Sequence, residues 1–528
     1  VVGDAASISL MPSWSCSALC FEATALRGIA APLLAEQSSQ LEPSGVPENP
    51  FRSTAEEGLT TFSIDADGGS YSLTRAQVGS GSLPSPESIR VEEFLNYFHF
   101  HYAQPQGDEP LALYTELGDC PWNPAHRLLL VGMQGQELDF ADSPPANLVY
   151  LIDVSGSMTE PNKLPLLKRG FRLLTQLLRP QDTVSMVTYA GVESVVLQGA
   201  HGDDKDAILA AIDGLQSGGS TNGAGGIQKA YELASQYFID GGTNRVLLAT
   251  DGDFNVGLSS TDELVQLIAT ERASGVQLSV YGFGSAWDGG NYRDEMCEQL
   301  ADNGDGFYFY IDGDEEARRA FSYTVSSSLL TVAKDVKVQA AFNPSLVRGY
   351  RLIGYENRLL SNSDFSNDSV DAGELGASMS VTALFELIPA DSNEALPTPL
   401  PGTIPEVATA ADGSAAATTD AVDTQSYPAL GEGDVAQLRI RYKASGSDTS
   451  TLRTLNLEGS IARQPSPKFA FAAGVAEFAL WLRGSQYLPL VRDEALRQQF
   501  ETALPLDGEG AIQEAIALLG SAHALPGR

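Results

Sequence analysis

Between residues 147 and 330 the sequence alternates short runs of aliphatic and β-branched residues with longer stretches whose apolar residues recur at helical spacing. This alternation is typical of an open, mostly parallel sheet with helices on both faces. Strands are expected at 148–153, 183–189, 194–198, 245–250, 277–282 and 307–311. Six strands suit one sheet, so the sequence predicts a Rossmann-like α/β domain over residues 146–330.

The segments on either side of this domain carry strand patterns that no helix interrupts. The simplest architecture therefore inserts the α/β domain between two portions of one β-sandwich. A chain of 528 residues is also too long for a single hydrophobic core. We expect an N-terminal arm or linker (1–60), a helical and β segment that is part of the sandwich (61–145), the α/β domain (146–330), the rest of the sandwich (331–465) with a mobile loop (389–425), and a small C-terminal helical region (466–528).

The charge balance restricts the partners. Lys and Arg total 32 against 68 Asp and Glu, which gives a net charge of -36 and makes nucleic acid an improbable ligand. No apolar run is long enough to span a membrane, and no signal peptide is expected because the first basic residue is Arg27. The acidic stretches SIDADGGSY and IDGDEEA are expected to be solvated turns.

The four cysteines do not form a recognisable framework. Cys16, Cys20, Cys120 and Cys297 are too scattered for a zinc cluster with paired spacing. A bridge between Cys16 and Cys20 and inert thiols both remain open as interpretations.

Hydroxyl and carboxylate side chains follow the first predicted strand of the α/β domain. The stretch VYLIDVSGSMTE places Asp153, Ser155 and Ser157 directly after it. Ligands of open parallel sheets bind at the carboxyl ends of the strands, so this position favours a site. The spacing alone is a weak signal, because Ser and Asp after a strand also cap helices.

Two further strand ends strengthen the prediction of a site. Thr221 lies in the Gly-rich stretch SGGSTNGAGG, and Asp251 follows the predicted strand in VLLATDGDFN. Together the three loops offer two carboxylates and three hydroxyls. Hard oxygen donors of this kind suit a divalent cation, Mg²⁺ first, with Mn²⁺ or Ca²⁺ as alternatives.

These residues resemble the metal-ion-dependent adhesion site of the von Willebrand factor A (VWA) domain family, which has the pattern D-x-S-x-S, then Thr, then Asp. The resemblance implies that Ser155, Ser157 and Thr221 are direct ligands and that Asp153 and Asp251 bind directly or through water. Stretches such as TFSIDADGGSYSLTRAQV and NRVLLATDGDFNVG are similar to the bacterial YfbK-type branch of the family, over roughly residues 47–520. The same resemblance implies a place in the cell envelope or outside the cell, in the periplasm or on the surface.

Neutral hydroxyl ligands leave much of the charge of a divalent cation uncompensated, so the cation retains affinity for another anionic ligand. We therefore expect a metal-dependent protein-binding or adhesion module whose partner offers Asp or Glu. Asp253 and Asn255, beside Asp251, are candidates for contact with that partner.

Other functions are less well supported by the sequence. The run from Asp251 to Asp262 begins like an EF-hand loop, but Val256 stands where that loop needs Gly. No histidine or cysteine lies in the site loops, so we do not expect an enzyme. A Mg²⁺-dependent hydrolase and an accessory subunit of an AAA+ ATPase remain the alternatives.

Overall fold

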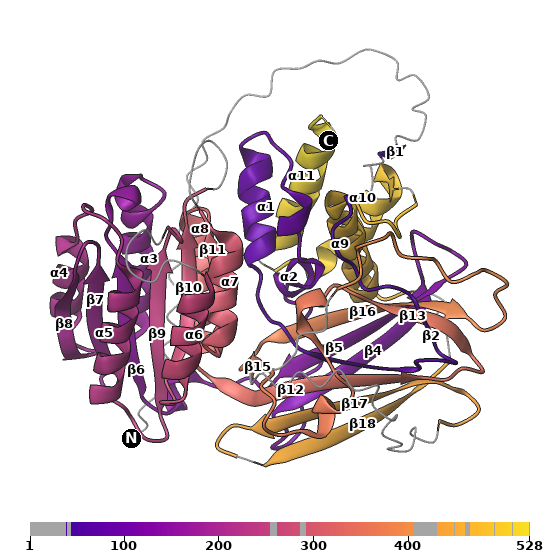
Figure 1. The fold of residues 1–528 in the computed structure, drawn as a ribbon, viewed down its shortest axis with the longest axis horizontal. Coiled ribbons are helices and arrows are strands. Elements are labelled where there is room, and N and C mark those ends of the chain that lie inside the picture. The colour runs from indigo at the N-terminus through magenta and orange to yellow at the C-terminus, as the bar shows by residue number, and fades with distance from the viewer. Residues whose placement is uncertain are drawn as a thin grey trace, which may run out of the picture.

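The structure, a computed structural model, describes residues 38–39, 44–253, 261–285, 292–405, 430–447, 449–459, 465–489, 491–508 and 510–526. Asn255, the pair Cys16 and Cys20, and most of the predicted loop 389–425 lie outside these ranges. The molecule has an α/β unit at one end, two stacked β-sheets at the other, and a layer of helices that covers the stacked sheets and extends to the α/β unit (Figure 1).

The predicted α/β sheet is confirmed. Its six strands follow the order β11-β10-β9-β6-β7-β8, and every neighbouring pair is parallel except β7 with β8. The strands are β6 (Ala146–Asp153), β7 (Thr183–Tyr189), β8 (Glu193–His201), β9 (Thr243–Thr250), β10 (Gln277–Phe283) and β11 (Tyr308–Ile311).

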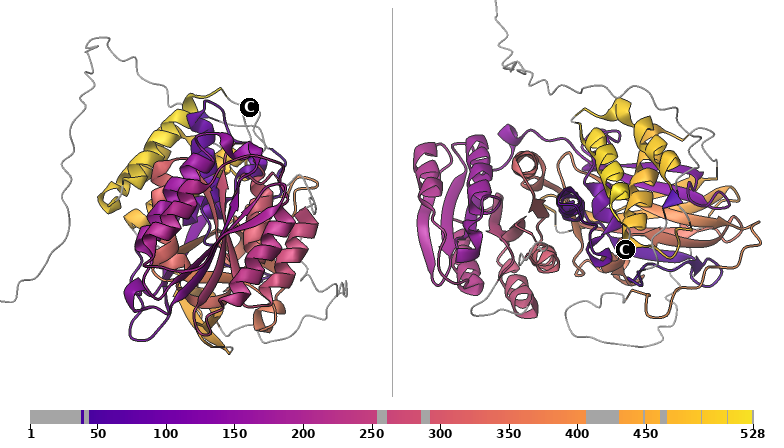
Figure 2. Two further views of the ribbon diagram at one scale, coloured as in Figure 1. Left: turned by 90° about the vertical axis from the view of Figure 1, so that its left-hand side faces the viewer. Right: turned by 90° about the horizontal axis from the view of Figure 1, so that it is seen from above.

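Helices cover both faces of this sheet (Figure 2), so its central strands are buried on both sides. Tyr150 and Ile152 of β6 pack in one core with α3 (Leu164–Leu177), α4 (Lys205–Gly214) and α8 (Asp314–Tyr323). Val149 and Leu151 pack in the opposite core with α5 (Gly223–Gln236), α6 (Thr261–Arg272) and α7 (Asp294–Asn303).

The two stacked sheets are built from strands that precede and follow the α/β unit, which confirms the predicted insertion. In one sheet β3 pairs with β12, and in the other β5 pairs with β16. The first sheet contains β3 (Leu59–Ser63), β12 (Thr331–Phe342), β14 (Leu359–Leu360), β15 (Gly373–Gly376), β17 (Asp434–Ala444) and β18 (Ser450–Glu458). The second contains β2 (Arg52–Ser53), β4 (Leu111–Asp119), β5 (Arg127–Gly135), β13 (Val347–Ile353) and β16 (Ser380–Pro389).

Rings from the two sheets meet in the core between them, where Phe342 of β12 stacks on Tyr350 of β13 with 4.3 Å between ring centroids. The connections into and out of the α/β unit meet at Thr243, the first residue of β9. Its backbone N–H donates to the carbonyl of Pro145 at 3.1 Å, and its hydroxyl donates to the carbonyl of Leu329 at 2.8 Å. The two ends of the insertion are therefore held side by side.

A helical layer packs on the second sheet. It comprises α1 (Gly69–Gly79), α2 (Val91–Asn96), α9 (Pro467–Arg483), α10 (Asp493–Thr502) and α11 (Ala511–Ala524), beside the short pair β1 (Ser38–Ser39) and β19 (Val491–Arg492). Short 3₁₀ segments lie at Pro86–Ser88, Phe140–Asp142, Gly156–Thr159, Glu356–Arg358, Asp364–Ser366 and Leu504–Leu506, and a π turn lies at Thr324–Ser328. In the described ranges no helix has the length and apolar character to cross a membrane.

The prediction of solvated turns in SIDADGGSY is wrong. Asp65 and Asp67 are buried, and α1 begins two residues after Asp67. The Asp67 carboxylate accepts from the backbone N–H of Tyr308, in the α/β unit, at 3.0 Å. Asp67 therefore ties the segment before α1 to the edge strand of the inserted sheet.

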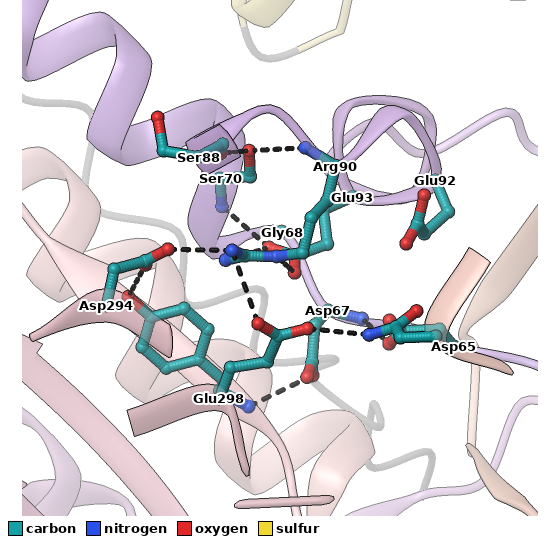
Figure 3. A network of polar contacts seen from close by, with 12 residues as sticks. Asp65, Asp67, Gly68, Ser70, Ser88, Arg90, Glu92, Glu93, Asp294 and Glu298 are labelled. Atoms are coloured by element: carbon teal, nitrogen blue, oxygen red, sulfur yellow. Dashed lines mark hydrogen bonds and ion pairs between the residues drawn. The ribbon is translucent and has the colours of Figure 1, made fainter. Parts of the chain in front are cut away.

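Arg90 lies at the centre of the same junction (Figure 3). Its guanidinium forms ion pairs with Glu93 of α2, with Asp294 of α7 at 2.7 Å and with Glu298 of α7 at 3.3 Å. Burial raises the pKa of Glu93 to about 7, although Arg90 acts in the opposite direction. A network of buried charges thus joins the helical layer to the α/β unit.

Candidate metal centre

The two acidic residues of the predicted site leave the sheet on neighbouring strands. β6 and β9 are parallel and in register from Ala146↔Thr243 to Ile152↔Ala249, so Asp153 and Asp251 emerge at the same edge. Both side chains are fully buried. The Asp153 carboxylate accepts from the Ser155 backbone N–H at 2.9 Å and from the Thr250 hydroxyl at 3.1 Å, which fixes its orientation.

Backbone hydrogen bonds bring the Thr221 loop against the loop that carries the serines. The N–H of Gly218 donates to the carbonyl of Val154 at 2.7 Å, and the N–H of Gly156 donates to the carbonyl of Gly219 at 3.0 Å. Gly219 has φ +88, a conformation that glycine adopts without strain. Thr221, only 2% exposed, is therefore held beside the serine loop, as the sequence predicts.

The two serine hydroxyls lie next to each other, with 2.9 Å between Ser155 Oγ and Ser157 Oγ. Ligands at 2.0–2.1 Å from Mg²⁺ in an octahedron are about 2.9 Å from their neighbours. The pair thus has the spacing of one octahedral edge, and the donor set fits a hard cation. The site has only two carboxylates, and nowhere in the described ranges is a group of three or more His, Cys, Asp or Glu side chains placed to hold a metal ion.

The two carboxylates of the site are buried close to each other, which is unfavourable when both are charged. The pKa of Asp153 is raised to about 7, first by burial and then by the nearby Asp251 carboxylate, although the hydrogen bonds from Ser155 and Thr250 act in the opposite direction. Two carboxylates in one dry pocket repel each other, and a cation between them relieves that repulsion.

A lysine that the sequence reasoning did not single out also belongs to the site. Lys163 Nζ donates to Asp251 Oδ2 at 2.9 Å, and the Lys163 and Asp251 side chains are 7% and 0% exposed. Lys163 directly precedes α3 in the stretch NKLPLLK, and its partner lies 88 residues later in the chain. No local pattern signals such a contact, because the two residues meet only once the sheet has formed.

The rim of the site includes one of the two predicted partner contacts. Asp253 is buried, and its backbone N–H donates to Asp251 Oδ1 at 3.2 Å, so this residue shapes the loop after β9. Asn255 is among the residues that the structure does not describe. Arg293, an exposed residue that sequence analysis also missed, has its backbone against Gly252, where a Cβ would lie 3.1 Å from the Arg293 nitrogen.

Three family models match parts of the chain. Residues 327–525 match "Uncharacterized protein YfbK, C-terminal", residues 148–253 match "von Willebrand factor type A domain", and residues 39–130 match "von Willebrand factor". The second of these contains Asp153, Ser155, Ser157, Thr221 and Asp251.

Individual proteins match as well. Uncharacterized protein YfbK from Escherichia coli (strain K12) is 38% identical over 479 residues, which cover 89% of this chain and 79% of that protein. Human inter-alpha-trypsin inhibitor heavy chain H3 is 24% identical over 198 residues, 35% of this chain and 22% of that protein. Among solved structures, a von Willebrand factor type A protein from Catenulispora acidiphila has a TM-score of 0.44 and 15% identity, over 79% of this chain and 91% of that one.

Proposed function

The chain belongs to the YfbK-like family of von Willebrand factor type A proteins, and we propose that it binds a protein partner through a divalent cation, Mg²⁺, held at the carboxyl edge of its six-stranded sheet. The oxygens of Ser155, Ser157 and Thr221 would hold the ion directly. Asp153 and Asp251 would hold it directly or through water. When bound, the ion supplies a positive contact point for an anionic group.

The 2.9 Å spacing of the two serine hydroxyls carries this proposal. Ser155 does not act as a helix cap: its side chain accepts no hydrogen bond from a backbone N–H of the 3₁₀ segment that follows it, and its hydroxyl bonds to that of Ser157 instead. On this proposal the two hydroxyls would form two corners of a coordination shell.

The donor set also indicates the chemistry of the partner. Three neutral hydroxyls contribute no charge, and Ser157 is only half-buried, so an ion held there would be accessible to a partner from this side. A carboxylate of an Asp or Glu in the partner completes the shell with the charge that the hydroxyls lack. We place this capture in the cell envelope or outside the cell, as the family resemblance implies.

Isothermal titration of the chelator-treated protein with Mg²⁺, with and without acetate as a carboxylate probe, tests the proposal. We expect saturable Mg²⁺ binding that weakens at least tenfold in Ser155→Ala and Asp251→Ala. Asp240→Ala, an exposed acid in the turn before β9, is the matched control and should leave binding unchanged. Equal Mg²⁺ binding by all four proteins would place the ion elsewhere and overturn the proposal.

A further inference from the structure

We infer that Lys163 is a permanent counter-cation of the metal site. Its charge lowers the affinity of the site for the divalent ion and raises the affinity of the ion-loaded site for a partner carboxylate. The inference rests on the proposed function, because it assigns a role to Lys163 toward the same ion. Its starting point is the buried ion pair in which Lys163 Nζ lies 2.9 Å from Asp251 Oδ2.

Gly284 leaves the space through which the Lys163 side chain reaches Asp251. Gly284, after β10, has φ +107, and a Cβ there would lie 2.7 Å from Lys163 Cε and 3.4 Å from Nζ. The Gly284 carbonyl accepts a hydrogen bond from the Tyr310 hydroxyl, which holds the glycine in place. Only a residue without a side chain leaves this path to Asp251 open.

The backbone of Lys163 is equally well fixed. Its N–H donates to the carbonyl of Glu160 at 3.0 Å, and its own carbonyl accepts from the N–H of Leu167 at 2.8 Å, in the first turn of α3. The ammonium is therefore delivered to Asp251 by a rigid helix start. It is a fixed part of the site and not a surface lysine that reaches in.

A charge count shows what the ammonium does. With both carboxylates ionised, Asp153, Asp251 and Lys163 together carry a net charge of about -1 before the ion binds and about +1 afterwards. Without Lys163 these values are about -2 and 0. The groups are buried, where charges interact more strongly than in water, so one unit of charge changes both affinities substantially.

The two affinities should change in opposite directions. Removal of the Lys163 charge makes the empty pocket more negative, and Mg²⁺ then binds more tightly, by about tenfold. The same removal leaves the loaded pocket without net positive charge, so the affinity of Mg²⁺-loaded protein for acetate falls by about tenfold. A lysine with a purely structural role would lower both affinities when replaced, because the site around it would be distorted.

The experiment compares wild type with Lys163→Gln and Lys163→Met, by calorimetric titration with Mg²⁺ and then by titration of the Mg²⁺-saturated proteins with acetate. Lys163→Gln retains a hydrogen-bond donor toward Asp251, and thermal melting in chelator identifies any variant that fails to fold. Lys229→Met is the control, since Lys229 lies on the outside of α5 and pairs only with the exposed Glu232 in the described structure. We expect the control to match wild type.

Tighter Mg²⁺ binding together with weaker acetate binding in folded Lys163→Gln supports the inference. Mg²⁺ binding by wild type with both affinities unchanged or both reduced in Lys163→Gln overturns it and leaves the metal site intact. No Mg²⁺ binding by wild type or by either Lys163 variant overturns the proposed function itself, and this inference with it.

Discussion

Arg75 of α1 and Asp312, after β11, face each other across the junction between the helical layer and the α/β unit, joined by two N–H···O bonds of 2.8 Å. Arg75 also pairs with Glu316 of α8 at 2.8 Å. The Arg75 and Asp312 side chains are 15% and 14% exposed, so both charges are largely withdrawn from water. The last helix of the inserted domain is thereby fastened to α1.

Replacement of Arg75 by Met should destabilise this junction. It leaves Asp312 without its guanidinium and deprives Glu316 of one of its two arginines, and breaking a buried ion pair on one side costs about 3–5 kcal/mol. Chemical denaturation measures the loss. The control is Arg318→Met, because the Arg318 pair with Glu315 is exposed and is worth roughly 0–1 kcal/mol. An equal effect of the two substitutions would contradict the assignment.

Mg²⁺ should stabilise the protein against heat, and chelation should remove the effect. An ion that binds the folded site alone, at a hundred times its Kd, adds about 2.7 kcal/mol. Thr221→Ala removes one predicted ligand and should abolish most of the Mg²⁺-dependent rise in Tm, measured by calorimetry. Thr270→Ala, an exposed threonine of α6, should keep the full rise. A rise that survives in Thr221→Ala would exclude that residue as a ligand.

Glu477 of α9 should make the stability depend on pH. Burial raises its pKa from 4.5 to about 7. Between these values the folded state holds a proton that the unfolded state has released, so the contribution of Glu477 to stability is full below about pH 4.5 and is lost as the pH rises through 7.

Glu477→Gln should remove this loss. At pH 8 we expect a gain of about 3 kcal/mol relative to wild type, and little difference at pH 4.5. Denaturation curves at several pH values give the comparison, with Glu494→Gln on the exposed face of α10 as the control. A gain that does not vary with pH would point to packing instead of protonation.

Moderate salt should speed the capture of an acidic partner. The net charge of -36 repels a carboxylate at long range, whereas the bound ion attracts it only nearby. Salt near 0.15 M shortens the Debye length to about 8 Å and screens the repulsion first. Stopped-flow association of an Asp-containing peptide with Mg²⁺-loaded protein should accelerate from low to moderate salt. An association rate that falls steadily as the salt concentration rises would contradict this prediction.

The strands of the inserted sheet were predictable because local composition determines them. Leu148 to Ile152 form an unbroken apolar run, as a strand buried on both faces requires, and the run ends at Asp153, the first predicted ligand. The spacing of Asp153, Ser155 and Ser157 could also be recognised in the sequence, because all three residues lie in one short loop. Sequence reasoning therefore located the edge of the sheet where the candidate site lies.

Helix α1 and Lys163 were not predictable from local patterns. The buried face of α1 includes Gly69, Ser70 and Ser72, which are small and polar, because the Tyr308 ring lies where a Cβ of Gly69 would be. These small residues interrupt the apolar pattern of Tyr71, Leu73 and Val78, which are also buried, so the pattern does not reveal the helix. Lys163 likewise depends on a partner on another strand, so its role becomes visible only in three dimensions.

The hydrogen bonds of Thr243 to Pro145 and Leu329 bear on how the chain assembles as it is synthesised. β5 ends at Gly135 and its partner β16 begins at Ser380, so at about 5–20 residues per second β5 waits roughly 12–50 s for its partner. An unfolded segment of that length would leave the waiting strands to search for those partners at a large entropic cost. Once folded, the insertion presents its entry and exit side by side, and so serves as an internal template on which the nascent sandwich closes.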